Sequence, residues 1–260
     1  MRPRVTPAGR RARTLFMTAT IPDYRYFRYR TINKHLIASL VNSQLYFAKP
    51  KNLNDPFDCR LDLRKSFSQA ASSATGTRKT WLQSALKDGK KFIERWERQF
   101  ENFGICSFSL SQRITLMWSH YADAHRGVCL LYRFPASFFL DPKNKIFGTD
   151  KVKYSQDALT VWLAHEAPME LKNFVQETAK IYLTAKSPAW KCEREVRVIR
   201  DKHGLMNIPF GYLEQVCFGL STPQVDIDLV TKLAGEYGGC KRFCQIVRGK
   251  RDFGITAKKM

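Results

Sequence analysis

Residues 127–134 read GVCLLYRF, a nearly continuous apolar run that predicts a buried β-strand. Residues 24–30 (YRYFRYR) alternate between aromatic and basic residues, and residues 195–200 (EVRVIR) alternate between charged and apolar residues. A period of two of this kind is typical of strands. Residues 104–110 (GICSFSL) predict a further strand. Shorter strands are predicted over 45–48, 152–154, 213–220 and 243–247, the last of which is expected to be the final strand.

Helices are predicted between these strands. Asn33 is expected to cap a helix over 34–43, because its side chain can accept hydrogen bonds from the first free N–H groups. Residues 79–101 predict a basic amphipathic helix, whose charged face is either an ordinary solvated face or a contact for phosphates. Shorter helices are predicted over 116–124 and 226–237.

Two stretches lack a continuous pattern. The small polar residues 66–77 indicate a linker or a flexible loop. Pro168 must break or kink the helical pattern over 158–186, which therefore predicts one long helix or two.

Strands and helices interleave without the regular long crossovers of a doubly wound sheet, so we predict an α+β fold.

The charge balance is strongly basic. The chain has 44 basic and 23 acidic residues, a net charge of +21, which favours nucleic acid or an anionic protein as a partner. Residues 1–16 contribute +5 and residues 241–260 contribute +6, charges that either bind phosphates or merely aid solubility. We expect a disordered basic arm over 1–16, a single domain over 17–250 and a basic tail over 251–260.

Composition also indicates the compartment. No apolar run approaches the roughly 20 residues that a membrane span needs, and no apolar segment of a secretory signal follows the basic N-terminus. The seven cysteines are an odd number, which favours reduced thiols in a cytoplasmic protein over a disulfide framework. Cys240 and Cys244 are the only close pair and have no histidine nearby, so we expect no metal site there.

Glu193 and Glu195 are the leading candidates for catalytic residues. Residues two apart on a strand point to the same face, and two carboxylates on one face repel unless a cation lies close. Arg197 shares that face and is the expected cation. The alternative is an exposed strand edge with an ordinary Arg–Glu pair.

Two other strands carry polar pairs with the same spacing. Ser107 and Ser109 can orient a catalytic carboxylate or a ribose, and Arg28 and Arg30 can bind a pyrophosphate, with Tyr29 on the opposite face. Solvated strand faces are the alternative for both pairs.

Residues 117–127 form the densest polar and aromatic cluster. Trp118 and Tyr121 share a helical face, and His125 lies at the helix end, where it can act as a general base, a phosphate ligand or a packing corner. Asp55 and Asp58 can bind a metal with the histidines or cap a turn. A restriction-type nuclease would use Asp58 with Glu195 and residue 197, but an arginine at 197 cannot give up a proton.

The chain resembles a bacterial family known as domain of unknown function 2971 over residues 24–250. Four motifs in order carry the resemblance. They are Tyr29-Arg30, Leu45-Tyr46-Phe47 followed by residues 54–58 (NDPFD), Met117-Trp118-x-x-Tyr121-x-x-x-His125-x-Gly127, and Trp190-x-x-Glu193-x-Glu195-x-Arg197.

A second resemblance is to ADP-ribosyltransferases of the Arg–Ser–Glu class. It implies a single domain with a split, mostly antiparallel sheet flanked by helices, and NAD as a substrate. It further implies a catalytic Glu195, an acceptor-positioning Glu193 and a bracing Ser107. The candidate NAD-binding residues are Arg28, Tyr29, Arg30, Ser109, Trp118, Tyr121 and His125.

These resemblances lead to two functional expectations. The first is an NAD-dependent ADP-ribosyltransferase-like toxin or phage-defence effector that acts on protein or nucleic acid. The second is a non-catalytic nucleic-acid-binding module of a mobile element or defence system.

Overall fold

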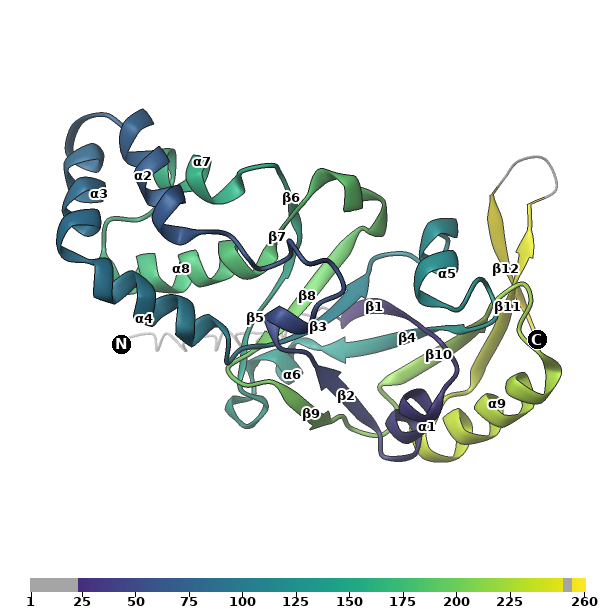
Figure 1. Cartoon of the computed structure of the whole chain (residues 1–260). Helices are drawn as coiled ribbons and strands as arrows, with labels where there is room; N and C mark the ends of the chain where they lie inside the picture. The colour runs from purple at the N-terminus through teal and green to yellow at the C-terminus, as the bar shows by residue number, and fades with distance from the viewer. Residues whose placement is uncertain (1–22, 250–253) are drawn as a thin grey trace, which may run out of the picture.

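The computed structural model describes residues 23–249 and 254–260, which form an α+β fold around an eight-stranded sheet (Figure 1). The strand order is β12-β11-β10-β4-β1-β3-β8-β5, and every neighbouring pair is antiparallel except β10 and β11. The strands are β1 (Asp23–Arg30), β3 (Gly104–Ser109), β4 (Val128–Pro135), β5 (Ile146–Lys151), β8 (Glu195–Arg200), β10 (Leu213–Phe218), β11 (Arg242–Arg248) and β12 (Ile255–Lys259).

The sheet almost divides in its middle. Strand β1 pairs with β4 along its whole length, but it pairs with β3 only where Phe27 faces Ser109. The predicted α+β class and the mostly antiparallel sheet flanked by helices are thus confirmed. Two small sheets stand apart from it, β2 (Gln44–Phe47) with β9 (Gly204–Asn207), and β6 (Lys153–Tyr154) with β7 (Ala185–Lys186).

Helices flank the sheet in two groups. In Figure 1 a lobe of five helices, α2, α3, α4, α7 and α8, lies to one side, while α1 and α9 lie together at the other. The α-helices are α1 (Lys34–Val41), α2 (Leu63–Ser73), α3 (Gly76–Asp88), α4 (Lys90–Phe100), α5 (Thr115–Tyr121), α6 (Ala136–Leu140), α7 (Ala158–His165), α8 (Leu171–Thr184) and α9 (Gln224–Gly238). Among the described residues the short 3₁₀ helices are η1 (Pro50–Asn52), η2 (Pro142–Asn144) and η3 (Pro188–Glu193). Within the described residues no helix is both long and apolar enough to cross a bilayer.

Local sequence features explain where one helix begins and where another pattern is interrupted. Asn33 caps α1, and its Oδ1 accepts hydrogen bonds from the N–H groups of His35 and Leu36 at 3.0 and 3.1 Å. The pattern over 158–186 is divided into α7 and α8, with Pro168 between them. The two-helix alternative is therefore the correct one.

Three predictions about the lobe and the C-terminus are wrong. The expected linker over 66–77 is mostly helix α2 and the start of α3, because Phe67 and Ala70 are buried in the lobe. The single helix over 79–101 is interrupted at Gly89, where a Cβ would lie 2.2 Å from the carbonyl oxygen of Ala85. The strand over 243–247 is not the final one, because β12 follows it in the chain and pairs with β11.

Strands β5 and β9 were not predicted at all. The basic arm expected over 1–16 lies outside the described residues.

Candidate functional site

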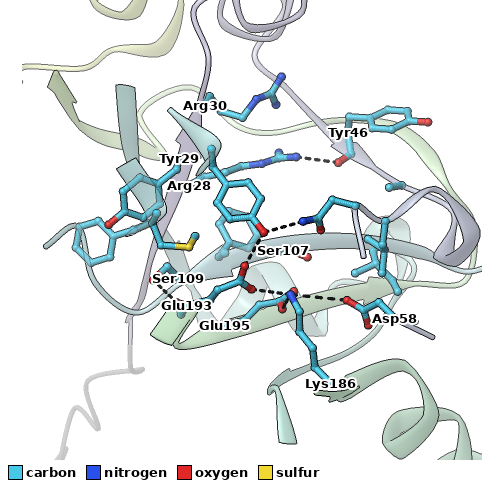
Figure 2. Close-up of a pocket in the computed structure, with 18 of the residues that line it drawn as sticks. Arg28, Tyr29, Arg30, Tyr46, Asp58, Ser107, Ser109, Lys186, Glu193 and Glu195 are labelled. Carbon is cyan, nitrogen blue, oxygen red and sulfur yellow. Dashed lines mark hydrogen bonds and ion pairs between the residues drawn. The ribbon is translucent and has the colours of Figure 1, made fainter. Parts of the chain in front are cut away.

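A cavity of about 360 Å³ lies where β1 and β3 part (Figure 2). It is lined by the ends of both strands, the loop after η1, one face of α5, the last residue of η3, and residues before and after η3. Eight of the ten predicted site residues line it, namely Arg28, Tyr29, Arg30, Ser107, Ser109, Tyr121, Glu193 and Glu195.

One wall of the cavity is basic. Arg28 and Arg30 lie two apart on β1, and Arg28 donates a hydrogen bond to the carbonyl oxygen of Tyr46 at 3.3 Å. The half-buried side chain of Arg30 has no hydrogen-bond or ion-pair partner among residues 23–249 and 254–260. Burial and the charge of Arg28 both lower the pKa of Arg30. An anion bound here would relieve both effects.

The opposite wall is acidic. Glu193 is the last residue of η3 and Glu195 the first of β8, and Arg194 between them adopts a left-handed conformation with φ of 49°. The prediction that the two glutamates share a strand is therefore wrong. Their carboxylates nevertheless converge on Lys186, whose Nζ lies 2.6 Å from Glu193 and 2.9 Å from Glu195.

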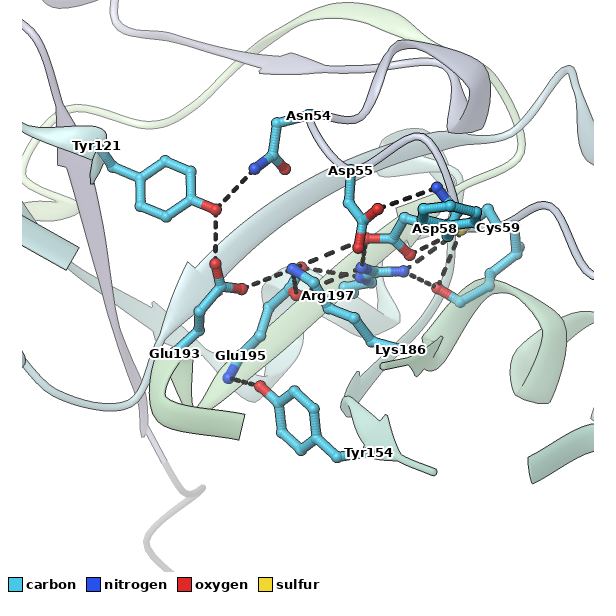
Figure 3. Close-up of polar contacts among 12 residues, drawn as sticks. Asn54, Asp55, Asp58, Cys59, Tyr121, Tyr154, Lys186, Glu193, Glu195 and Arg197 are labelled. Carbon is cyan, nitrogen blue, oxygen red and sulfur yellow. Dashed lines mark hydrogen bonds and ion pairs between the residues drawn. The ribbon is translucent and has the colours of Figure 1, made fainter. Parts of the chain in front are cut away.

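Arg197 is the second cation of this buried cluster (Figure 3). Its Nε donates to Glu195 Oε1 at 2.8 Å, and its Nη2 donates to Asp58 at 2.5 Å. Burial alone would raise the pKa of Glu195, but the charges of Arg197 and Lys186 outweigh it and lower that pKa to about 2. Glu195 is only 5% exposed and Arg197 is fully buried, so the alternative of an exposed strand edge is wrong.

Tyr121 connects the acidic wall to the loop after η1 (Figure 3). Its hydroxyl donates to Glu193 Oε1 at 2.5 Å and accepts a hydrogen bond from Asn54 Nδ2 at 2.8 Å. Burial, and then the adjacent Glu193 carboxylate, raise the pKa of Tyr121, so the phenol stays protonated and donates.

The predicted serines and Tyr29 take different roles. Ser107 is half-buried and hydrogen-bonds Glu195, as a bracing residue would. Ser109 is buried and donates to the backbone carbonyl of Glu193 at 2.7 Å, so it fixes the turn before β8. Tyr29 donates to the carbonyl of Ser111 at 2.9 Å. Its hydroxyl is therefore occupied within the protein.

Trp118 and His125 do not line the cavity. Trp118 is fully buried and donates to the carbonyl of Gln112 at 2.8 Å. The ring of His125 stacks on Trp118 with centroids 6.3 Å apart, and its Nε2 lies 3.3 Å from Ser119 Oγ. These two residues form the packing corner that was one of the alternatives for this cluster.

The structure also places residues that sequence reasoning missed. Lys186 was not singled out, because a single lysine within the pattern over 158–186 carries no signal. Asn54 was quoted only as part of the motif over 54–58. Asp55 does cap a turn, accepting from the N–H of Phe57 at 2.9 Å, whereas Asp58 pairs with Arg197.

The arrangement argues against the nuclease alternative. Arg197 and Lys186 lie between the carboxylates of Asp58 and Glu195, where a catalytic metal would have to bind. Among the described residues no group of three His, Cys, Asp or Glu side chains is placed to hold a metal ion.

Residues 117–198 match the sequence model of a family described as "Protein of unknown function (DUF2971)". The predicted resemblance to this family is confirmed over that stretch, which carries Tyr121, Lys186 and the acidic wall, while the basic wall on β1 lies outside it. No curated protein and no solved structure is significantly similar to the chain.

Proposed function

We propose that the cavity binds NAD+ and transfers its ADP-ribose, as in an ADP-ribosyltransferase-like enzyme. One observation carries the proposal: Arg30, which has no partner among the described residues, and a carboxylate cluster face the same cavity from opposite walls. NAD+ has a matching polarity, because its pyrophosphate is anionic and its nicotinamide end is cationic.

The basic wall suits the pyrophosphate. Guanidinium groups bind phosphate oxygens through paired N–H donors, and Arg30 has its donors free of partners among the described residues. Arg28 contributes a second positive charge beside it. The volume of about 360 Å³ falls within the range of roughly 300–1,000 Å³ that is usual for small-molecule sites.

The acidic wall suits the reacting end. When the glycosidic bond breaks, nicotinamide leaves with the bonding electron pair and the ribose carbon becomes oxocarbenium-like. The buried cluster has three carboxylates against Lys186 and Arg197, a net charge of −1 that stabilises such a cation. The acceptor then bonds to that carbon and releases a proton, which Glu193 takes up.

Glu195 acts in this scheme by charge rather than as a base. Its pKa of about 2 keeps it ionised at any physiological pH. Both of its oxygens already accept hydrogen bonds, which fixes the carboxylate where positive charge develops. A cytoplasmic toxin or phage-defence effector that acts on protein or nucleic acid is the cellular context that we propose for this chemistry.

The test is a calorimetric titration of the full chain with NAD+, together with nicotinamide release. We expect the wild type to bind NAD+ and release nicotinamide, and the Glu195→Gln variant to lose release. Glu236→Gln is the matched control, because Glu236 is exposed on α9 and does not line the cavity. Absence of NAD+ binding by the wild type would overturn the proposal.

A further inference from the structure

The loop beside the cavity carries exposed positive charge. Lys51 immediately precedes the three lining residues at 52–54, and Arg60 Nη2 donates to the carbonyl oxygen of Lys51 at 3.3 Å. Both side chains are exposed, and neither makes an ion pair with any of residues 23–249 and 254–260. These two charges are therefore available to an anion that lies beside the lining residues 52–54.

The same loop holds an aromatic ring in solvent. Phe57 is 80% exposed, although the residues on both sides of it are fixed. Asp55 accepts from the N–H of Phe57 through Oδ1 at 2.9 Å and from the N–H of Asp58 through its carbonyl at 3.1 Å. Asp58 is buried and paired with Arg197. Phe57 is thus presented by a hydrogen-bonded turn, and an aromatic ring exposed in this way can stack on a nucleobase.

A second exposed aromatic ring borders the cavity. Tyr46 lines it and is 43% exposed, and its backbone carbonyl is held by Arg28. We call Tyr46 and three residues of the neighbouring loop, Lys51, Phe57 and Arg60, the rim; the loop lines the cavity at 52–54 and at Asp58. The rim therefore combines two exposed aromatic rings with two cations that form no ion pair among the described residues. Planar rings stack on nucleobases while cations bind the phosphates, and proteins that bind single strands use this combination.

We propose that this rim binds single-stranded nucleic acid and presents it as the acceptor to the cavity. The acceptor role rests on the proposed function, whereas binding at the rim does not. An acidic peptide would use Lys51 and Arg60 but would gain little from the two rings. In the transfer step, the ribose carbon of NAD+ loses nicotinamide and bonds to a nucleophilic oxygen or nitrogen of the strand, and Glu193 takes the displaced proton.

The test measures fluorescence anisotropy of a labelled 12-nucleotide poly-dT with the full chain at low salt. We expect binding, and a Kd raised on the order of tenfold by Phe57→Ala, because stacking is worth about that factor per base. Phe210→Ala is the matched control, because Phe210 is 69% exposed and lies far along the chain from the loop over 51–60 that lines the cavity at 52–54, and it should leave Kd unchanged. Equal effects of the two variants would overturn the proposal.

Salt dependence tests the two cations. The Lys51→Gln, Arg60→Gln double variant should reduce the slope of log K against log salt by about 1.4, since each phosphate contact on a single strand contributes about 0.7. Lys258→Gln with Lys259→Gln removes the same charge from exposed positions on β12. An equal change in slope from this pair would show diffuse attraction and overturn the proposal.

Two further outcomes separate the inference from the proposed function. Rim-dependent binding of poly-dT by a chain that does not bind NAD+ would support the inference and overturn only the proposed function. Displacement of poly-dT by polyglutamate as effectively as by unlabelled poly-dT, or transfer of ADP-ribose to protein alone, would overturn the inference.

Discussion

Lys186 and Glu193 form a buried ion pair, with Nζ 2.6 Å from Oε2 and side chains that are 3% and 5% exposed. The same ammonium group lies 2.9 Å from Glu195 and 3.7 Å from Asp58. Lys186 therefore holds three carboxylates together from the two-residue strand β7. Burial alone would lower the pKa of Lys186, but the charges of Glu195 and Glu193 outweigh it and raise that pKa, so Lys186 stays protonated.

Replacement of this lysine should destabilise the fold strongly. In Lys186→Met the carboxylates lose a buried counter-ion. The free energy of unfolding of this variant should therefore be lower than that of the wild type by about 3–5 kcal/mol. Urea unfolding measures the loss. Lys180→Met is the matched control, because its pair with Asp150 is 39% and 35% exposed and is worth about 0–1 kcal/mol. Similar losses in the two variants would contradict a buried role for Lys186.

The pH dependence of stability should reveal Glu195. Its pKa in the folded chain is about 2, below the usual 4.5, so its ionised form adds stability above pH 4.5. That contribution is lost as the pH falls from about 4.5 through 2. The difference in the free energy of unfolding between wild type and Glu195→Gln should therefore be largest near neutral pH and shrink in acid. A difference that stays constant from pH 7 to pH 2 would contradict the lowered pKa.

Arg30 should contribute to NAD+ affinity without contributing to stability. Its charge is half-buried and unpaired among the described residues, so Arg30→Gln should leave the melting temperature unchanged or raise it slightly. The Kd for NAD+ should rise about tenfold or more, because a hydrogen bond to a charged group is worth about 1.5–3 kcal/mol. Arg25→Gln on the same strand is the control, since Arg25 pairs with Glu214 away from the cavity. An equal loss of affinity in both variants would count against a phosphate contact.

Part of the candidate site could be predicted because its elements are short local patterns. Arg28 and Arg30 share a strand face by the period of two, and both line the cavity, although Phe27 and Tyr29 at the alternate positions line it too. Glu193 and Glu195 line the cavity for a different reason. Only the left-handed conformation of Arg194 turns them toward one cation, and no strand pattern predicts that conformation.

Other features depend on tertiary structure. Lys186 meets carboxylates seven and nine residues later in the chain, at distances that only the fold of η3 and β8 determines. Helix α2 was missed because its serines and alanines resemble a linker, whereas burial of Phe67 and Ala70 in the lobe stabilises it. Strand β12 was missed because its lysines indicate a solvated tail, although an edge strand tolerates them.

The close approach of two backbone segments behind Arg30 gives the last prediction. A Cβ on Gly127 would lie 2.3 Å from the carbonyl oxygen of Arg30 and 2.9 Å from that of Ala122, so Gly127→Ala must push β1 away from the start of β4. We expect a loss of about 1–3 kcal/mol in the free energy of unfolding, and weaker NAD+ binding because Arg30 moves. Gly148→Ala is the matched control, since a Cβ there meets nothing within 4 Å. Gly148 lies within strand β5, where alanine should be neutral or stabilising by up to about 1 kcal/mol. Equal stability of the two variants in urea unfolding would show that β1 and β4 do not approach as closely as this contact requires.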